Sequence, residues 1–154
     1  MSWTPLVAAI VGAVIAMGST LLAERRRTQR EDAAEWRRTR QSLYSKFLAA
    51  HAQAGSDLRN IASTPDLELG ERYRQARAAY TLCYVSRHEL EILAPDSVVR
   101  PAYECSRSVR AMRDAVSTGA TLDTPDFTEL TNQYLHFRLQ TTVAMRSDLV
   151  SGRR

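Results

Sequence analysis

The hydrophobic residues of the chain follow two patterns: one uninterrupted apolar segment near the N-terminus, and then rows of apolar residues spaced three and four apart. The segment from Thr4 to Ala23 holds 20 consecutive residues without a charge. As a helix it would be about 30 Å long, which matches the hydrocarbon core of a bilayer. The later rows are typical of helices that bury one face. No alternation of apolar and polar residues predicts a strand.

The spaced rows predict four helices. The first ends before Ser63, and the other three span about 66–93, 97–118 and 125–150. The residues expected to face a common core are Leu43, Phe47, Ala50, Ala54, Leu58, Ile61, Leu69, Tyr73, Ala76, Tyr80, Cys83, Leu90, Val98, Ala102, Cys105, Val109, Met112, Val116, Phe127, Leu130, Tyr134 and Phe137. Short loops between helices favour antiparallel neighbours. The predicted fold is all-α: an N-terminal transmembrane helix that continues into an antiparallel up-down four-helix bundle.

The apolar segment has three interpretations: a retained membrane anchor, a cleaved signal peptide, or a buried helix of a soluble domain. Residues Ala16-Met17-Gly18 would serve as a cleavage site, but the first four residues lack the Lys or Arg with which a secretory signal begins. The arginines follow the segment, and such residues hold their side of a membrane protein in the cytoplasm. We therefore expect a single-pass protein of the cell membrane, with its N-terminus outside and its body cytoplasmic.

These patterns divide the chain into four predicted parts. Residues 1–23 form the anchor, 24–42 a basic helical neck, 43–150 the helical bundle, and 151–154 a basic tail. The neck and the start of the bundle, from Glu24 to Lys46, carry eight basic and four acidic residues, which accounts for the whole net charge of +4.

The arginines beside the apolar segment are the strongest functional feature of the sequence. Basic side chains at an inner-leaflet surface each gain about 1 kcal/mol from anionic lipid, so the residues expected to contact headgroups are Arg25, Arg26, Arg27 and Arg30. They also have a purely topological interpretation, in which they only orient the anchor. Nucleic acid is an unfavoured partner, because a nucleic-acid-binding domain usually carries its basic patch on the folded body.

Small residues recur every fourth position within the apolar segment, at Ala8, Gly12 and Ala16. This spacing lets two membrane helices approach closely, so it is a candidate helix–helix contact. The alternative is that alanine and glycine are simply common in such helices.

No constellation of residues indicates catalysis, a metal or a cofactor. His51, His88 and His136 lie on different predicted helices, and the Glu-x-x-His pairs of di-metal bundles are absent. Cys83 and Cys105 lie at similar distances from the turn at Pro95, so we expect them to be neighbouring buried thiols, which are usually inert. Tyr84 and Tyr103 lie off the apolar rows and are candidates for a partner contact if they are exposed.

Three stretches resemble a group of short actinobacterial single-pass membrane proteins: the arginine-rich neck, Leu43-Tyr44-Ser45-Lys46-Phe47-Leu48-Ala49-Ala50, and Leu90-Glu91-Ile92-Leu93-Ala94-Pro95-Asp96-Ser97-Val98-Val99. The resemblance implies one membrane helix followed by a cytoplasmic helical bundle, and it implies no activity.

The sequence as a whole predicts a membrane-anchored, non-enzymatic scaffold or adaptor that binds a protein partner or itself. The alternative is a membrane-active protein of phage or plasmid type, such as a pore former or a transfer factor, that assembles through its transmembrane helix.

Overall fold

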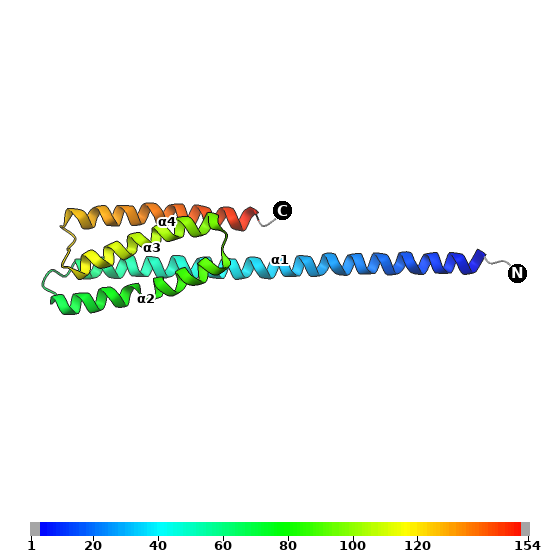
Figure 1. Ribbon diagram of the computed structural model, residues 1–154, viewed down its shortest axis with the longest axis horizontal. Coiled ribbons are helices and arrows are strands. Elements are labelled where there is room, and N and C mark those ends of the chain that lie inside the picture. The colour runs from blue at the N-terminus through cyan, green and yellow to red at the C-terminus, as the bar shows by residue number, and fades with distance from the viewer. Residues whose placement is uncertain (1–3, 152–154) are drawn as a thin grey trace. The chain divides into compact units, whose positions relative to one another are not determined.

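The structure is a computed structural model that describes the backbone of residues 4–151 and the side chains of residues 24, 27–29 and 31–151. It contains four helices: α1 (Thr4–Ala62), α2 (Leu69–Leu93), α3 (Asp96–Ser117) and α4 (Pro125–Ser151) (Figure 1). No strand occurs in the described part of the chain. The prediction of an all-helical protein with four helices is confirmed.

The chain divides into two compact units, residues 1–38 and residues 39–154. The second unit is a helical bundle in which α2 packs on α3 and α3 packs on α4. The end of α1 joins this bundle through side-chain contacts. Arg40 Nη1 donates to both carboxylate oxygens of Asp148 at 2.9 Å, and Tyr134 donates its hydroxyl to the carbonyl of His51 at 3.0 Å.

The predicted core rows match the structure best in α3. Its six predicted core residues, Val98, Ala102, Cys105, Val109, Met112 and Val116, are all fully buried. The row in α3 is regular because every third or fourth residue is apolar, which gives the helix one unambiguous buried face. Pro101 lies inside α3 without ending it.

The start of α2 differs from its predicted row. Leu69 and Tyr73 are exposed, and Arg72 is the buried residue there, with only 2% of its surface accessible. The guanidinium of Arg72 donates to Thr64 O at 2.6 Å and to Ala120 O at 3.1 Å. These carbonyls follow the C-terminal ends of α1 and α3, where helix dipoles favour a positive charge. Arg72 therefore has partners for its charge on the buried face of α2.

The helix ends have identifiable causes. Glu68 caps α2 by accepting hydrogen bonds from Gly70 N at 3.0 Å and Glu71 N at 3.2 Å, so α2 begins at Leu69 rather than at about Asp66. Beyond the end of α3, Gly119 has a φ of 103°, a conformation that costs other residues steric strain.

The predicted localisation in the cell membrane is corrected by the structure. Searched over the described residues, the helices include none that combines the length and the apolar character needed to cross a bilayer. Among the described side chains of α1, those from Glu24 to Lys46 include an ionisable group in nearly every turn, and charges are costly in hydrocarbon. The side chains of the predicted span, residues 4–23, lie outside the described part of the chain. The single-pass localisation and its transmembrane helix are therefore not retained.

Candidate functional site

The residues that the sequence marked as candidates lie mostly outside the part whose side chains are described. This holds for Arg25, Arg26 and Arg30 and for the small residues Ala8, Gly12 and Ala16. Arg27 is described. Its side chain is 78% exposed, and its Nε donates to Glu31 Oε1 at 2.9 Å along the same helix. The membrane-surface and helix–helix contacts expected of these residues stay predictions.

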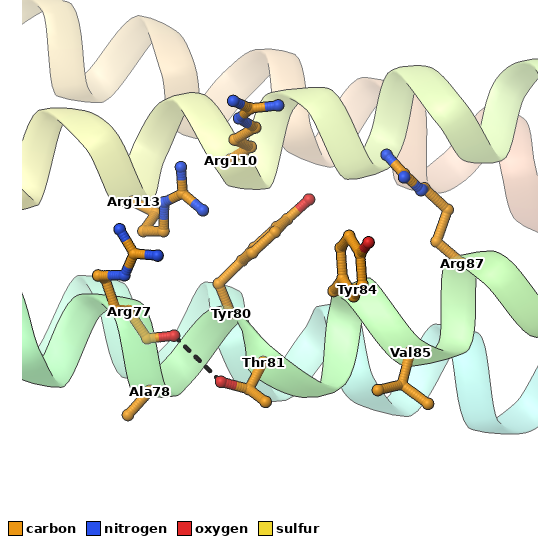
Figure 2. A pocket seen from close by; sticks show the side chains of 9 residues that line it. All are labelled: Arg77, Ala78, Tyr80, Thr81, Tyr84, Val85, Arg87, Arg110 and Arg113. Atoms are coloured by element: carbon orange, nitrogen blue, oxygen red, sulfur yellow. Dashed lines mark hydrogen bonds between the residues drawn. The ribbon is translucent and has the colours of Figure 1, made fainter.

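A pocket rich in arginine lies between α2 and α3, and we call it the α2/α3 pocket (Figure 2). Its volume is about 530 Å³, within the usual range for small-molecule sites. Its lining residues are Arg77, Ala78, Tyr80, Thr81, Tyr84, Val85, Arg87, Arg110 and Arg113. Four of the nine are arginines and none is acidic, so the lining is strongly positive.

The spacing of the lining residues explains how two helices build the α2/α3 pocket. Positions 77, 80, 84 and 87 follow intervals of three, four and three, which place them on one face of α2. Arg110 and Arg113 are one turn apart on α3. Figure 2 shows the rings of Tyr80 and Tyr84 between Arg87 on one side and Arg77 and Arg113 on the other.

The four arginines of the α2/α3 pocket are incompletely neutralised. Arg113 pairs with Asp114, and Arg110 Nε lies 4.0 Å from the same carboxylate. Arg87 Nε lies 3.3 Å from Glu91 Oε1 but is buried without a hydrogen-bond partner, because the two groups are poorly aligned. Two carboxylates thus face four guanidinium groups.

Arg77 is the least compensated of the four. Within the described structure no carboxylate lies in salt-bridge distance of it, and its Nη1 donates to the Tyr73 hydroxyl at 2.9 Å. The other arginine in this part of α2, Arg74, is instead paired with Glu71. The α2/α3 pocket therefore keeps an excess of positive charge that the chain's own acids do not balance.

Two of the four arginines of the α2/α3 pocket, Arg87 and Arg113, lie beside aromatic rings. The guanidinium carbon of Arg113 lies 4.8 Å from the ring centre of Tyr80, and that of Arg87 lies 5.7 Å from Tyr84 and 6.0 Å from Tyr103. Such stacking limits the side-chain freedom that a ligand would otherwise have to remove. Tyr84 is 56% exposed and Tyr103 is 48% exposed, so both meet the condition that the sequence analysis set for a partner contact.

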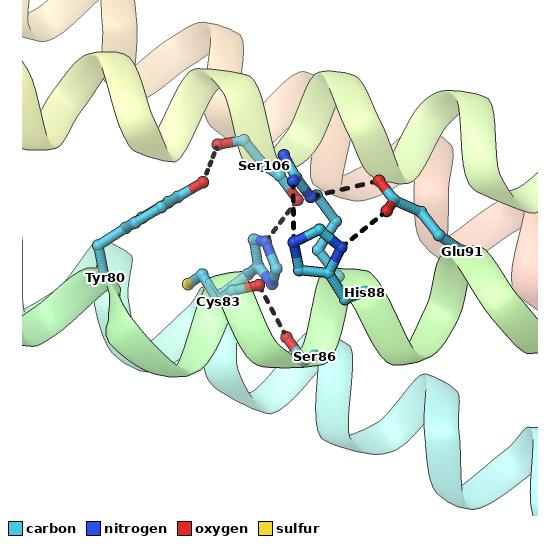
Figure 3. Close-up of polar contacts among 8 residues, drawn as sticks. Tyr80, Cys83, Ser86, His88, Glu91 and Ser106 are labelled. Carbon is cyan, nitrogen blue, oxygen red and sulfur yellow. Dashed lines mark hydrogen bonds and ion pairs between the residues drawn. The ribbon is translucent and has the colours of Figure 1, made fainter.

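A polar network lies inside the bundle, below the α2/α3 pocket. His51 is fully buried, and burial lowers its pKa to about 4, so the ring is neutral near pH 7. Its Nδ1 donates to Phe47 O at 2.9 Å, and its Nε2 accepts the Ser106 hydroxyl at 2.8 Å. Tyr80 donates its hydroxyl to the Ser106 carbonyl at 3.4 Å, which links α3 to the pocket lining (Figure 3). Both ring nitrogens of His51 therefore take part in hydrogen bonds inside the core.

The other histidines lie on the surface of single helices. On α2, His88 Nδ1 bonds Glu91 Oε2 at 3.1 Å (Figure 3), and on α4 His136 bonds Gln140 at 3.0 Å. Within the described residues, no group of three or more His, Cys, Asp or Glu side chains is placed to hold a metal ion.

The two cysteines are buried and free. Burial, together with a smaller effect of the nearby Cys105, raises the pKa of Cys83 to about 12. Burial also raises the pKa of Cys105 to about 12. Both groups are therefore thiols rather than thiolates at neutral pH, and a thiol is a poor nucleophile.

Two apolar surfaces remain on the outside of the bundle. One is a row along α4, which we call the α4 row: Leu135, Leu139, Val143 and Val150, which are 44–65% exposed. The other is a groove of about 440 Å³ between α1 and α2, with Ala49, Ala50, Leu82 and Val85 among its lining. Exposed apolar residues aligned on one helix face are typical of association surfaces.

The α2/α3 pocket was not predicted, although one signal of it was present in the sequence. The side chains of Arg77, Tyr80, Tyr84 and Arg87 are spaced three, four and three residues apart, which places them on one mixed face of α2. What the sequence lacked was the register that brings Arg110 and Arg113 of α3 opposite this face.

No protein-family model, no curated protein and no solved structure matches this chain. The resemblance to short actinobacterial proteins therefore stays a prediction, and function has to be argued from the molecule's own surfaces.

Proposed function

We propose that this protein is a non-enzymatic scaffold or adaptor that acts by association, and that the α4 row joins two copies of the chain. The main observation in support of this proposal is that three apolar side chains are exposed at intervals of four residues. Leu135 is 44% exposed, Leu139 is 65% exposed and Val143 is 58% exposed. With Val150 included, the row extends about 22 Å along the helix axis. Isolated exposed apolar residues are ordinary, but an aligned row of this length favours a helix partner.

The arrangement of helices in the bundle is part of this proposal. We infer that the last part of α1, α2, α3 and α4 alternate in direction, as an antiparallel up-down bundle. Three contacts support this inference: Arg40 with Asp148, His51 with Tyr134, and Ala62 O with Leu122 N at 3.3 Å. From Arg40 through His51 to Ala62 the residue numbers rise along α1, while the numbers of their partners fall from Asp148 through Tyr134 to Leu122. Such opposite order is expected when α1 and α4 run in opposite directions. In this arrangement α4 lies on the outside of the bundle with its row uncovered.

The charges of α4 favour a second copy of the chain over an unrelated partner. Asp126 and Glu129 lie near its start, while Arg138 and Arg146 lie in its second half, and all four are exposed. An antiparallel pair with its two-fold axis between Leu135 and Leu139 brings Glu129 of one copy level with Arg146 of the other. A symmetric contact of this kind closes on itself as a dimer.

The assignment to a non-enzymatic class is supported by the state of the reactive groups. Both thiols are buried with a raised pKa, and the buried His51 uses its two ring nitrogens in the core. These groups are unsuited to nucleophilic or acid–base work at neutral pH. Association then remains the activity that the described surfaces support best.

Sedimentation velocity of the full-length chain tests the proposal. Leu139→Glu places a carboxylate in the middle of the α4 row and should shift the chain towards the monomer by at least tenfold in dissociation constant, because burying an unpaired charge costs more than about 1.4 kcal/mol. The matched control is Leu82→Glu, since Leu82 is 63% exposed on α2. The control should associate as the wild type does.

Two outcomes would contradict the proposal. A wild-type chain that stays monomeric up to about 0.1 mM would show that the α4 row does not drive self-association. Loss of association in Leu82→Glu with none in Leu139→Glu would assign the interface to the groove between α1 and α2 instead.

A further inference from the structure

We propose that the α2/α3 pocket binds a small ligand that carries two or more phosphate groups. This inference is independent of the α4 row, because the α2/α3 pocket is built from α2 and α3 alone.

Charge is the first reason for a phosphorylated ligand. The α2/α3 pocket has four guanidinium groups, and within the described structure only Glu91 and Asp114 lie in salt-bridge distance of them. A single carboxylate ligand would neutralise at most one of the remaining charges. A phosphate group carries a charge between about −1.5 and −2 and presents three acceptor oxygens. One phosphate group therefore balances most of the excess of two charges, and the number of phosphate groups depends on how far apart the arginines lie.

Geometry is the second reason. Arginine presents its N–H groups in a planar fork that matches phosphate oxygens in pairs. Arg77 from α2 and Arg110 from α3 are exposed guanidinium groups that line the same pocket from two helices. Arg113 is only 17% exposed and is stacked on Tyr80, which fixes it in the pocket lining without a ligand. Figure 2 shows Arg77 and Arg113 together at one end of the α2/α3 pocket, with Arg110 on α3 above Tyr80.

Arg87 supplies a further observation. Its side chain is 21% exposed, and its buried Nε has no hydrogen-bond partner. A buried donor without a partner costs free energy in the ligand-free chain. Figure 2 places Arg87 at the other end of the α2/α3 pocket from Arg77 and Arg113, with Tyr84 beside it. A ligand whose anionic groups are separated from one another, as in an oligophosphate, can contact both ends of the α2/α3 pocket at once.

Isothermal titration calorimetry of the full-length chain with inorganic tripolyphosphate, in about 0.15 M salt, tests this inference. Arg77→Gln and Arg110→Gln should each weaken binding by about fivefold or more, since each removes one charge-assisted contact. The matched controls are Arg74→Gln on α2 and Arg107→Gln on α3, which lie one turn away and pair with Glu71 and Glu104. Binding by the controls should stay within about twofold of the wild type. Far-ultraviolet circular dichroism confirms that each variant is helical.

A second ligand, a nucleoside triphosphate, distinguishes the source of the phosphate groups. A nucleoside triphosphate that binds more tightly than tripolyphosphate, with the gain lost in Tyr84→Ala, supports a nucleotide whose base covers the exposed Tyr84 ring. Equal binding of the two ligands supports recognition of the phosphate chain alone. Failure of the wild-type chain to bind either ligand at about 5 mM would overturn the inference. Equal losses in the control variants, or equal binding of a glutamate peptide with the same charge, would overturn it as well.

Discussion

Replacement of Arg72 by methionine is the most informative test of how the bundle is held together. Arg72 is 2% exposed, and its guanidinium has only carbonyl partners within the described structure: Thr64 O at 2.6 Å, Ala120 O at 3.1 Å, and Ile61 O and Pro65 O at 3.4 Å. The side chain thus acts as a cation at the C-terminal ends of two helices. Methionine has a similar length and no donor, so Arg72→Met removes these bonds while it leaves most of the packing.

The size of the effect follows from the two short bonds. A hydrogen bond from a charged donor contributes about 1.5–3 kcal/mol, and the carbonyls left buried without a partner add a further cost. Better burial of the apolar methionine side chain offsets part of this loss. We therefore expect Arg72→Met to lower the free energy of unfolding by about 3–4 kcal/mol, a large part of the 5–15 kcal/mol typical of a domain.

Urea denaturation of the full-length chain, followed by circular dichroism, measures this change. The control is Arg74→Met, two residues away on α2, where the side chain is 71% exposed and pairs with Glu71 at the surface. The control should unfold at the same urea concentration as the wild type. A loss smaller than about 1 kcal/mol in Arg72→Met would refute the interpretation that Arg72 joins the two helix ends.

Three further predictions concern the core. Because burial lowers the pKa of His51 to about 4, below its ordinary 6.5, its contribution to stability is complete above pH 6.5 and is lost as the pH falls towards 4. The loss amounts to about 3 kcal/mol in pH-dependent urea titrations, and His51→Gln should flatten the slope between pH 6.5 and 5. In Gly55→Ala the new Cβ would lie 2.8 Å from Tyr134 Cε1, so the melting temperature should fall in calorimetry, with a cost of about 1–3 kcal/mol. Cys83 and Cys105 should react with a thiol reagent only as fast as the bundle opens, whereas rapid labelling of the native chain would contradict their burial.

The regular parts of the fold could be predicted because they depend on local spacing. The row from Val98 to Val116 contains an apolar or small residue at every third or fourth position, and α3 buries all of them. The burial of both cysteines followed from the same spacing, and the effect of Cys105 on the pKa of Cys83 agrees with the expectation that they are neighbours. Only the helical period and the position of the turn at Pro95 were needed for these predictions.

The interior at the start of α2 could not be predicted in the same way. Hydrophobicity favoured Leu69 and Tyr73 as core residues, yet both are exposed and Arg72 is buried. Its burial depends on carbonyl groups of Thr64 and Ala120, which come together only when the ends of two helices are adjacent. A pattern along one helix contains no information about such partners.

The candidate site was hidden for a related reason. The arginines of α2 could be placed on one face from their spacing, but whether a basic face is solvated or forms a pocket depends on the neighbouring helix. Arg110 and Arg113 lie opposite this face only because α2 and α3 pack in one particular register. In the same way, exposure of the α4 row follows from which face of α4 the bundle buries, and the predicted row of Phe127 and Tyr134 identified that face correctly.

Cysteine cross-linking tests the central claim, that the α4 row joins two copies of the chain, most directly. The native Cys83 and Cys105 are both fully buried, so the full-length chain has little background reactivity with a cross-linker. Leu139→Cys places a thiol near the proposed two-fold axis, and Ile92→Cys places one on α2 at a residue that is 79% exposed. A short bis-maleimide applied to intact cells should give a covalent dimer of Leu139→Cys and leave Ile92→Cys monomeric. Equal cross-linking of the two variants, or none of Leu139→Cys, would contradict the account.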